Sequence, residues 1–258
     1  MKPQLCFFPE RPEKPRFSGL SMVMDKGLGI REASDLVETA SHLIDFIKLG
    51  FGTSLFTANV KEKAEIYRKA GIKTYVGGTL FEAFLIRNQL DDYYKWIDYL
   101  GLETVEISDG SISIPHDKKC ELISNISKKY TVLSEVGSKE AGVIITPGRW
   151  IKMMQAELGA GSFKVIAEAR ESGTVGIYRP DGSAHTALIN KIFEKVSGEK
   201  IIWEAPVKSQ QTWFIKHFGA NVNLGNIPPQ EIISLETLRT GLRGDTFGMH
   251  LPSTQFSA

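Results

Sequence analysis

The sequence has few of the features that define several common protein classes. It holds two cysteines, Cys6 and Cys120, among 258 residues. Because they are few and far apart in the chain, neither a disulfide framework nor a cysteine zinc site is expected, and they fit a reducing compartment. No apolar stretch approaches the ~20 residues of a membrane-spanning helix. We therefore predict a cytoplasmic protein without a membrane partner.

The N-terminus lacks the continuous apolar core of a secretory signal peptide. Pro9, Pro12 and Pro15 interrupt it and favour an extended backbone. We expect residues 1–18 to form an extended segment that precedes the first regular element.

The chain also has no strong excess of one sign of charge, because its formal net charge is +1 and no large block of like charges occurs. Nucleic acid is therefore not an expected partner. No linker or low-complexity stretch divides the chain, and its hydrophobic content of 42% is enough for a full core. We predict a single domain over residues 1–258 and a homo-oligomer of unspecified size.

Short apolar runs alternate with amphipathic stretches along the whole chain, which indicates parallel βα units. Eight such units in about 250 residues predict a (β/α)8 TIM barrel of the α/β class. A doubly wound open sheet is the alternative, but the segment 25–29 lacks the third glycine of a dinucleotide-binding turn. The strands are expected near Met22, Phe46, Tyr75, Val105, Val132, Val165, Ile202 and Val222, and the helices over 33–42, 60–70, 91–100, 118–130, 150–158, 187–196, 211–218 and 229–238.

Charged or polar residues follow most of these apolar runs. The run Thr131–Leu133, for example, leads to Glu135 and Lys139 across the glycine at position 137. Because the carboxyl ends of parallel barrel strands meet at one rim, these side chains are expected to converge there. They are Asp25, Lys26, Lys48, Glu106, Asp109, Glu135, Lys139, Glu168, Arg170, Glu204, Lys208 and Asn223.

Two interpretations of this rim are open. The charges could form an internal salt-bridge network that closes the barrel mouth, or they could form an active site. Several carboxylates on one rim repel one another unless a cation compensates. Oxygen ligands without Cys or His select a hard cation, so we predict Mg²⁺ held by Glu106, Glu135 and Glu168. None of the five histidines falls on a strand end, and each is interpreted as a surface or helix residue.

Nine segments in order along nearly the whole chain resemble the phosphosulfolactate synthase family. The resemblance implies a TIM barrel, Mg²⁺ dependence and the addition of sulfite to phosphoenolpyruvate to give (2R)-phospho-3-sulfolactate, which is carbon–sulfur lyase chemistry. The segments are MDKGL (24–28), DFIKLGFGTS (45–54), YVGGTLFEAF (75–84), VEISDGS (105–111), LSEVGSK (133–139), ARESG (169–173), WEAPVKSQQ (203–211), VNLGNI (222–227) and SLETLRTGLRGDTFG (234–248).

The resemblance also implies residue roles. Lys139 is the predicted proton donor because the family motif places it beside Glu135, with an ion pair between the two as the alternative interpretation. Lys48 is the second choice, and the predicted catalytic set is Lys139, Lys48 and Glu135. The phosphate is expected at the loops 206–210 and 225–228 or at the loop 170–173. The predicted substrate-binding residues are Lys26, Arg170, Ser172, Gly173, Lys208 and Asn223.

Other functions are open at this point. Plant heat-stress-associated proteins resemble the same family and are linked to thermotolerance, which makes a non-enzymatic barrel the alternative. A different Mg²⁺-dependent addition to, or elimination from, a phosphorylated enol is a further possibility. A chain freed from catalysis need not keep its charged rim, and this sequence keeps Glu106, Glu135, Lys139, Glu168 and Glu204.

Overall fold

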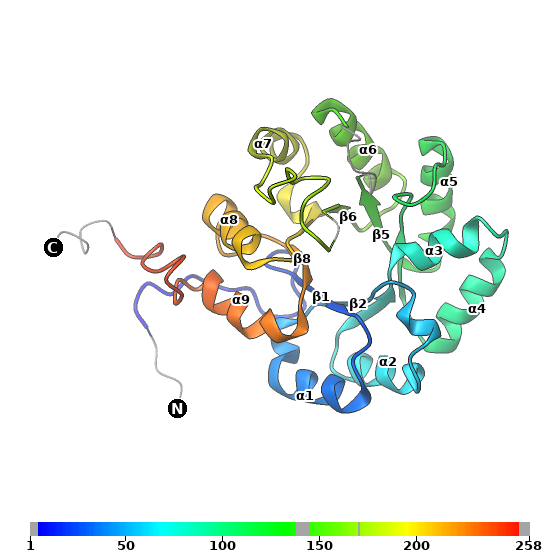
Figure 1. Ribbon diagram of the computed structural model, residues 1–258, viewed down its shortest axis with the longest axis horizontal. Coiled ribbons are helices and arrows are strands. Elements are labelled where there is room, and N and C mark those ends of the chain that lie inside the picture. Colours follow the sequence, from blue (N-terminus) through cyan, green and yellow to red (C-terminus); the bar gives the residue numbers. More distant parts are fainter. Residues whose placement is uncertain (1–4, 138–144, 170, 253–258) are drawn as a thin grey trace.

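A computed structural model describes residues 5–137, 145–169 and 171–252, and within them eight parallel strands form a nearly closed barrel (Figure 1). The strands are β1 (Ser21–Asp25), β2 (Phe46–Leu49), β3 (Lys73–Val76), β4 (Thr104–Ile107), β5 (Thr131–Val136), β6 (Lys164–Ala167), β7 (Ile201–Glu204) and β8 (Leu224–Ile227). They pair in the order β3-β2-β1-β8-β7-β6-β5-β4. The predicted barrel is confirmed, and the open doubly wound sheet is wrong.

Helices form the outer ring of the barrel (Figure 1). They are α1 (Ile30–Ala40), α2 (Val60–Lys69), α3 (Gly78–Leu85), α4 (Leu90–Leu100), α5 (His116–Ile126), α6 (Pro147–Gly159), α7 (Thr186–Lys195), α8 (Lys208–Phe218) and α9 (Ile232–Arg239). Helix α3 was not predicted, because its paired glycines at the start favour a turn rather than a helix. Within the described ranges, no helix combines the length and apolarity needed to cross a bilayer.

The barrel interior is a separate apolar cluster from the core between strands and helices. Four interior apolar residues are each followed, two positions later, by a charged one. Because strand side chains alternate between faces, each such pair points into the barrel, with the charged member nearer the carboxyl end. The pairs are Phe46 and Lys48, Leu133 and Glu135, Ile166 and Glu168, and Ile202 and Glu204. The apolar layer is therefore the floor of a charged layer.

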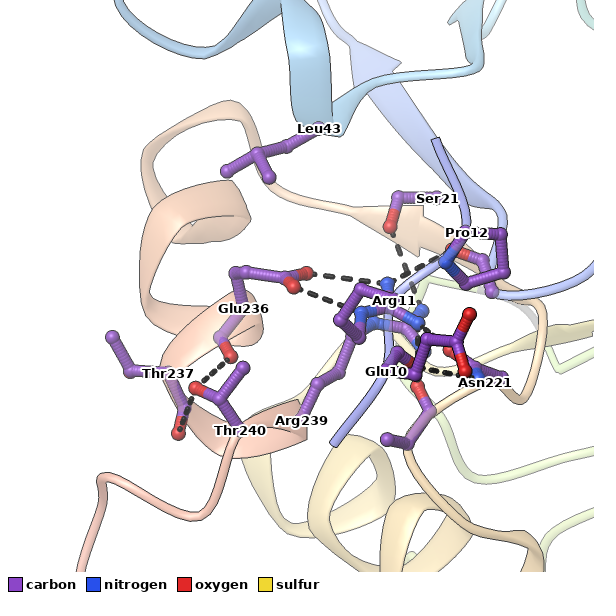
Figure 2. Close-up of polar contacts among 12 residues, drawn as sticks. Glu10, Arg11, Pro12, Ser21, Leu43, Asn221, Glu236, Thr237, Arg239 and Thr240 are labelled. Atoms are coloured by element: carbon purple, nitrogen blue, oxygen red, sulfur yellow. Dashed lines mark hydrogen bonds and ion pairs between the residues drawn. The ribbon is translucent and has the colours of Figure 1, made fainter. Parts of the chain in front are cut away.

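The N-terminal segment, residues 5–20, contains no helix or strand and lies at the opposite end of the barrel. Arg11 donates to both carboxylate oxygens of Glu236 on α9, at 2.8 and 3.2 Å, and to the Ala220 carbonyl at 3.0 Å (Figure 2). Lys14 donates to the Ile44 carbonyl at 2.6 Å. The outer helices end at this face, so its free carbonyls favour cationic partners. The basic residues thus fix the segment across the bottom of the barrel.

Candidate active site

A pocket of about 410 Å³ opens at the carboxyl ends of the strands. This volume is within the range of small-molecule sites, and barrel enzymes place their active sites at this face. Each strand contributes a lining residue or is followed directly by one, as β3 is by Gly77 and β6 is by Glu168. The lining residues are Met24, Lys48, Phe51, Gly77, Gly78, Thr79, Glu106, Glu135, Glu168, Glu171, Ser172, Glu204 and Asn226.

Lys48 is the buried cation among these carboxylates. Its Nζ lies 3.0 Å from Glu106 Oε2, 3.3 Å from Glu204 Oε1 and 3.6 Å from Glu135 Oε2. Burial alone would lower the pKa of Lys48, but the three carboxylates outweigh it and hold that pKa well above its usual value. Lys48 is therefore a fixed positive charge that binds three strands together across the barrel mouth.

Glu106 is held in place by the start of helix α3. The Gly78 N–H donates to Glu106 Oε1 at 2.5 Å. A side chain at position 78 would clash, since its Cβ would lie 2.8 Å from the same oxygen and would also meet Ser108. Glycine is thus required for the backbone to approach the carboxylate. The residue at the N-cap position of α3 is Gly77.

Glu204 lies at the centre of the acidic side of the pocket. One carboxylate oxygen accepts the Ala169 N–H at 2.9 Å and the other faces Lys48. Burial raises the pKa of Glu204 to about 7 against the opposing effect of Lys48, and Glu135 and Glu106 add to the rise. Such a carboxylate changes its charge readily near neutral pH.

Three buried carboxylates are placed to share a cation. Oxygen atoms of Glu135, Glu168 and Glu204 all lie within 4.8 Å of one another. The donor set is entirely oxygen, which fits a hard ion such as Mg²⁺. Two of these residues were predicted as metal ligands from the sequence. The third member of this group is Glu204. Glu106, the other ligand predicted from the sequence, lines the same pocket outside this group, and its role as a ligand stays a prediction.

A second buried lysine supports this pocket from behind. Lys119 on α5 is fully buried and donates to the Glu135 carbonyl at 2.6 Å. Its Nζ also lies 2.9 Å from both Asp109 Oδ1 and Glu157 Oε1. His116 joins the cluster at 3.2 Å from the same Glu157 oxygen. Asp109, which was expected on the rim, therefore belongs to this supporting cluster. His116, interpreted from the sequence as a surface or helix residue, is the first residue of α5 and a member of the same cluster.

Several other predicted rim residues lie outside the pocket lining. Asp25 accepts hydrogen bonds from Tyr67 and from the backbone of residues 27 and 28, and it pairs with Lys63. Lys26 is exposed and pairs with Glu171, which lines the pocket. Lys208 begins α8 and pairs with Asp245 at 2.6 Å. The structure thus gives these three charges protein partners.

Asn223 is the clearest correction to the predicted site. It precedes β8, so it lies at the amino end of the barrel, away from the pocket. Its Oδ1 accepts the Leu20 N–H at 3.0 Å, and its Nδ2 donates to the Ile201 carbonyl at 3.0 Å. The prediction failed because the sequence suggested a strand near Val222, whereas the strand begins at Leu224.

Asn226, three residues further on, lines the pocket instead. It is 6% exposed, has a left-handed backbone with φ of 56°, and its Oδ1 has no hydrogen-bond partner in the described part of the chain. A buried amide oxygen that faces a pocket in this way is available to a ligand. The only sequence signal for it was its polar character inside an otherwise apolar strand.

The remaining predicted site residues belong to the loops after β5 and β6, and the structure describes some of them. Ser172 lines the pocket, while the Gly173 carbonyl accepts a hydrogen bond from Gln210 at 2.8 Å. Lys139 and Arg170 lie outside the described residues, so their predicted roles stay predictions.

A parallel (β/α)8 barrel with a buried, lysine-centred carboxylate pocket at its catalytic face defines a TIM-barrel enzyme. Comparison with known proteins narrows this class. Residues 9–245 match the family described as (2R)-phospho-3-sulfolactate synthase (ComA). The chain belongs to the phosphosulfolactate synthase family.

Individual relatives agree with this assignment. The chain is 45% identical to a phosphosulfolactate synthase of Methanothermobacter thermautotrophicus, over 93% of this chain and 95% of that protein. It is 39% identical to the phosphosulfolactate synthase of Bacillus subtilis, over 93% and 96% of the two chains. The Arabidopsis thaliana protein HEAT-STRESS-ASSOCIATED 32 is more distant, at 22% identity over 96% and 94%.

Solved structures with the same architecture support the fold alone. The YdjI aldolase of Escherichia coli K12 superposes with a TM-score of 0.55 at 10% identity, covering 91% of this chain and 89% of its own. The 3-hexulose-6-phosphate synthase of Salmonella typhimurium gives 0.54 at 13%, covering 87% and 100%. Both are similar in backbone only.

Proposed function

We propose that this chain is a lyase that adds sulfite to phosphoenolpyruvate to give (2R)-phospho-3-sulfolactate, and that it requires Mg²⁺. The observation that carries the proposal is the buried pocket around Lys48 and its carboxylates in a chain 45% identical to a phosphosulfolactate synthase. The 410 Å³ volume suits two small anions together.

The reaction makes one carbon–sulfur bond. The sulfur lone pair of sulfite attacks the methylene carbon of phosphoenolpyruvate, and the electron pair of the double bond moves toward the carboxylate. A proton is then added to the carbon that bears the phosphate, so atoms and charge balance. The developing negative charge needs a positive environment. Lys48 supplies permanent charge there, but its raised pKa makes it a poor proton donor. Lys139 remains our proposed donor.

Glu135, Glu168 and Glu204 would hold the Mg²⁺ ion. When bound, the ion would act as a Lewis acid toward the carboxylate of the substrate. The residues of the chain do the positioning. Lys48 and the Ala169 N–H orient Glu204, while Lys119 fixes the backbone of Glu135.

The loop after β6 is our proposed phosphate site. Ser172 of this loop lines the pocket, and Asn226 in β8 offers a buried amide to the same pocket. The loop 206–210 after β7 contributes no lining residue, which favours 170–173 over it. Arg170 would add a bidentate cation to this subsite.

The test is to mix purified protein with phosphoenolpyruvate, sulfite and Mg²⁺ and to look for phosphosulfolactate by mass spectrometry. We expect product from the wild type and a large loss in Glu204→Gln, with no loss in Glu38→Gln, an exposed glutamate on α1. A folded wild type that forms no product would refute the enzyme proposal and favour the non-enzymatic alternative suggested by the heat-stress relative.

A further inference from the structure

A second cavity lies at the amino end of the barrel and has no part in the proposed reaction. It encloses about 540 Å³. We call it the lower cavity. Its walls come from the N-terminal segment, the starts of β2 and β3, and the loops before them. The lining residues are Lys14, Pro15, Arg16, Phe17, Leu20, Ser41, His42, Asp45, Phe46, Ala70, Gly71, Lys73 and Phe163.

Aromatic rings form much of its wall. Phe17 and Phe163 have ring centroids 6.4 Å apart at an interplanar angle of 56°. Phe17 is 63% exposed, although it is a large apolar residue beside a concave surface. Phe46, at the start of β2, contributes a further ring. An exposed aromatic face beside a concave surface favours a flat apolar ligand that packs against it.

Cations surround the same rings. The Nζ atoms of Lys164, Lys73 and Lys200 lie 5.0, 5.1 and 6.0 Å from the Phe163 ring centroid. The Lys73 Nζ is also 5.9 Å from the Phe46 ring. Cation–π contacts hold the ammonium groups but leave their charge uncompensated.

These cations differ in how much of their binding capacity is already used. Arg16 pairs with Asp45 at 2.9 Å, and Lys164 donates to the Phe17 carbonyl at 3.0 Å. Lys73, by contrast, makes no side-chain hydrogen bond or ion pair to any residue that the structure describes, although it lines the cavity. Among the described residues that line the cavity, Lys73 is therefore the lysine available to a ligand.

The local charge balance also favours an anion. Burial lowers the pKa of Lys164 to about 8, and the positive charge of Lys200 and then of Lys73 adds to this effect, opposed by Glu199 and Asp45. Because Asp45 is already engaged by Arg16, positive charge dominates at this face. A bound anion would relieve the repulsion among the lysines.

We propose that the lower cavity binds a small organic anion with a flat apolar body, whose sulfonate, carboxylate or phosphate group meets Lys73 at the rim while the body packs against Phe17, Phe46 and Phe163. The cavity is at the end of the barrel opposite the carboxylate pocket, so this site is separate from the proposed catalytic one. The inference does not depend on the proposed reaction.

The test uses the aromatic sulfonate 1-anilinonaphthalene-8-sulfonate as probe, titrated into the natively folded chain and followed by fluorescence. We expect saturable binding at one site per chain, unaffected by phosphoenolpyruvate. Lys73→Gln should weaken it about tenfold, the scale of one lost charge-assisted contact. Phe17→Ser, at an exposed position, should weaken it independently. Lys152→Gln, an exposed lysine on α6, is the matched control and should bind the probe as the wild type does.

Three outcomes would overturn the proposal. Equal probe affinity in Lys73→Gln, Phe17→Ser and the control would place the probe elsewhere. Competition by phosphoenolpyruvate would place it in the carboxylate pocket. Sedimentation velocity provides the third outcome: if Phe17→Ser converts an oligomer to monomers, a second copy of the chain covers the cavity. Circular dichroism of each variant excludes loss of fold as the cause of weak binding.

Discussion

Replacement of Lys119 by methionine tests the cluster behind the pocket. Lys119 is fully buried, with its Nζ 2.9 Å from carboxylate oxygens of Asp109 and Glu157 and 2.6 Å from the Glu135 carbonyl. Methionine keeps the apolar stem but leaves the buried Glu157 carboxylate with His116 as its partner at 3.2 Å. Removing one member of a buried ion pair costs about 3–5 kcal/mol. We expect Lys119→Met to lose that much unfolding free energy.

The assay is urea denaturation followed by circular dichroism. Lys118→Met is the matched control, because Lys118 is the preceding residue of the same helix and forms an exposed pair with Glu121 at 2.8 Å. Exposed pairs contribute below about 1 kcal/mol, so this variant should unfold almost as the wild type does. Adding Glu157→Gln to Lys119→Met should restore part of the loss. A loss below about 1 kcal/mol in Lys119→Met would refute the idea that this lysine compensates buried charge.

Four further outcomes are expected. Lys139→Ala should lower turnover roughly 10²–10⁴-fold and Lys139→Arg should not rescue it, as steady-state kinetics can show, because guanidinium does not release its proton near neutral pH. EDTA should abolish activity, and either Mg²⁺ or Mn²⁺ should restore it; full activity in excess chelator would contradict the metal proposal. Gly78→Ala should reduce kcat while the fold is retained by circular dichroism, because its Cβ would lie 2.8 Å from Glu106 Oε1. Burial alone would raise the pKa of Glu157, but Lys119, His116 and Ser134 hold this pKa below its usual value of 4.5. The ionised Glu157 therefore stabilises the fold above pH 4.5, and this contribution is lost as the pH falls through the lowered pKa. Glu157→Gln should flatten that part of a stability–pH curve.

The sequence by itself determined the architecture and the kind of site. The spacing of an apolar residue and a charged one two positions later, as in Ile166 and Glu168, is a local property of the strand. Alternation of side chains puts both on the same face, and parallel strands put all the charged members at one end. A charged layer above an apolar floor could therefore be predicted without knowing any contact between strands.

Only the tertiary structure decided which charges meet and which asparagine faces the pocket. The residue at which β8 begins depends on hydrogen bonds to residues distant in sequence, such as the bond from the Leu224 N–H to the Leu20 carbonyl at 2.9 Å. This position of β8 places Asn226 in the pocket and Asn223 at the amino end of the barrel. Which carboxylates come within 4.8 Å of one another, here those of Glu135, Glu168 and Glu204, likewise depends on how β5, β6 and β7 lie side by side in the barrel. Such choices are made by contacts between residues far apart in the chain, and a local pattern carries no information about them.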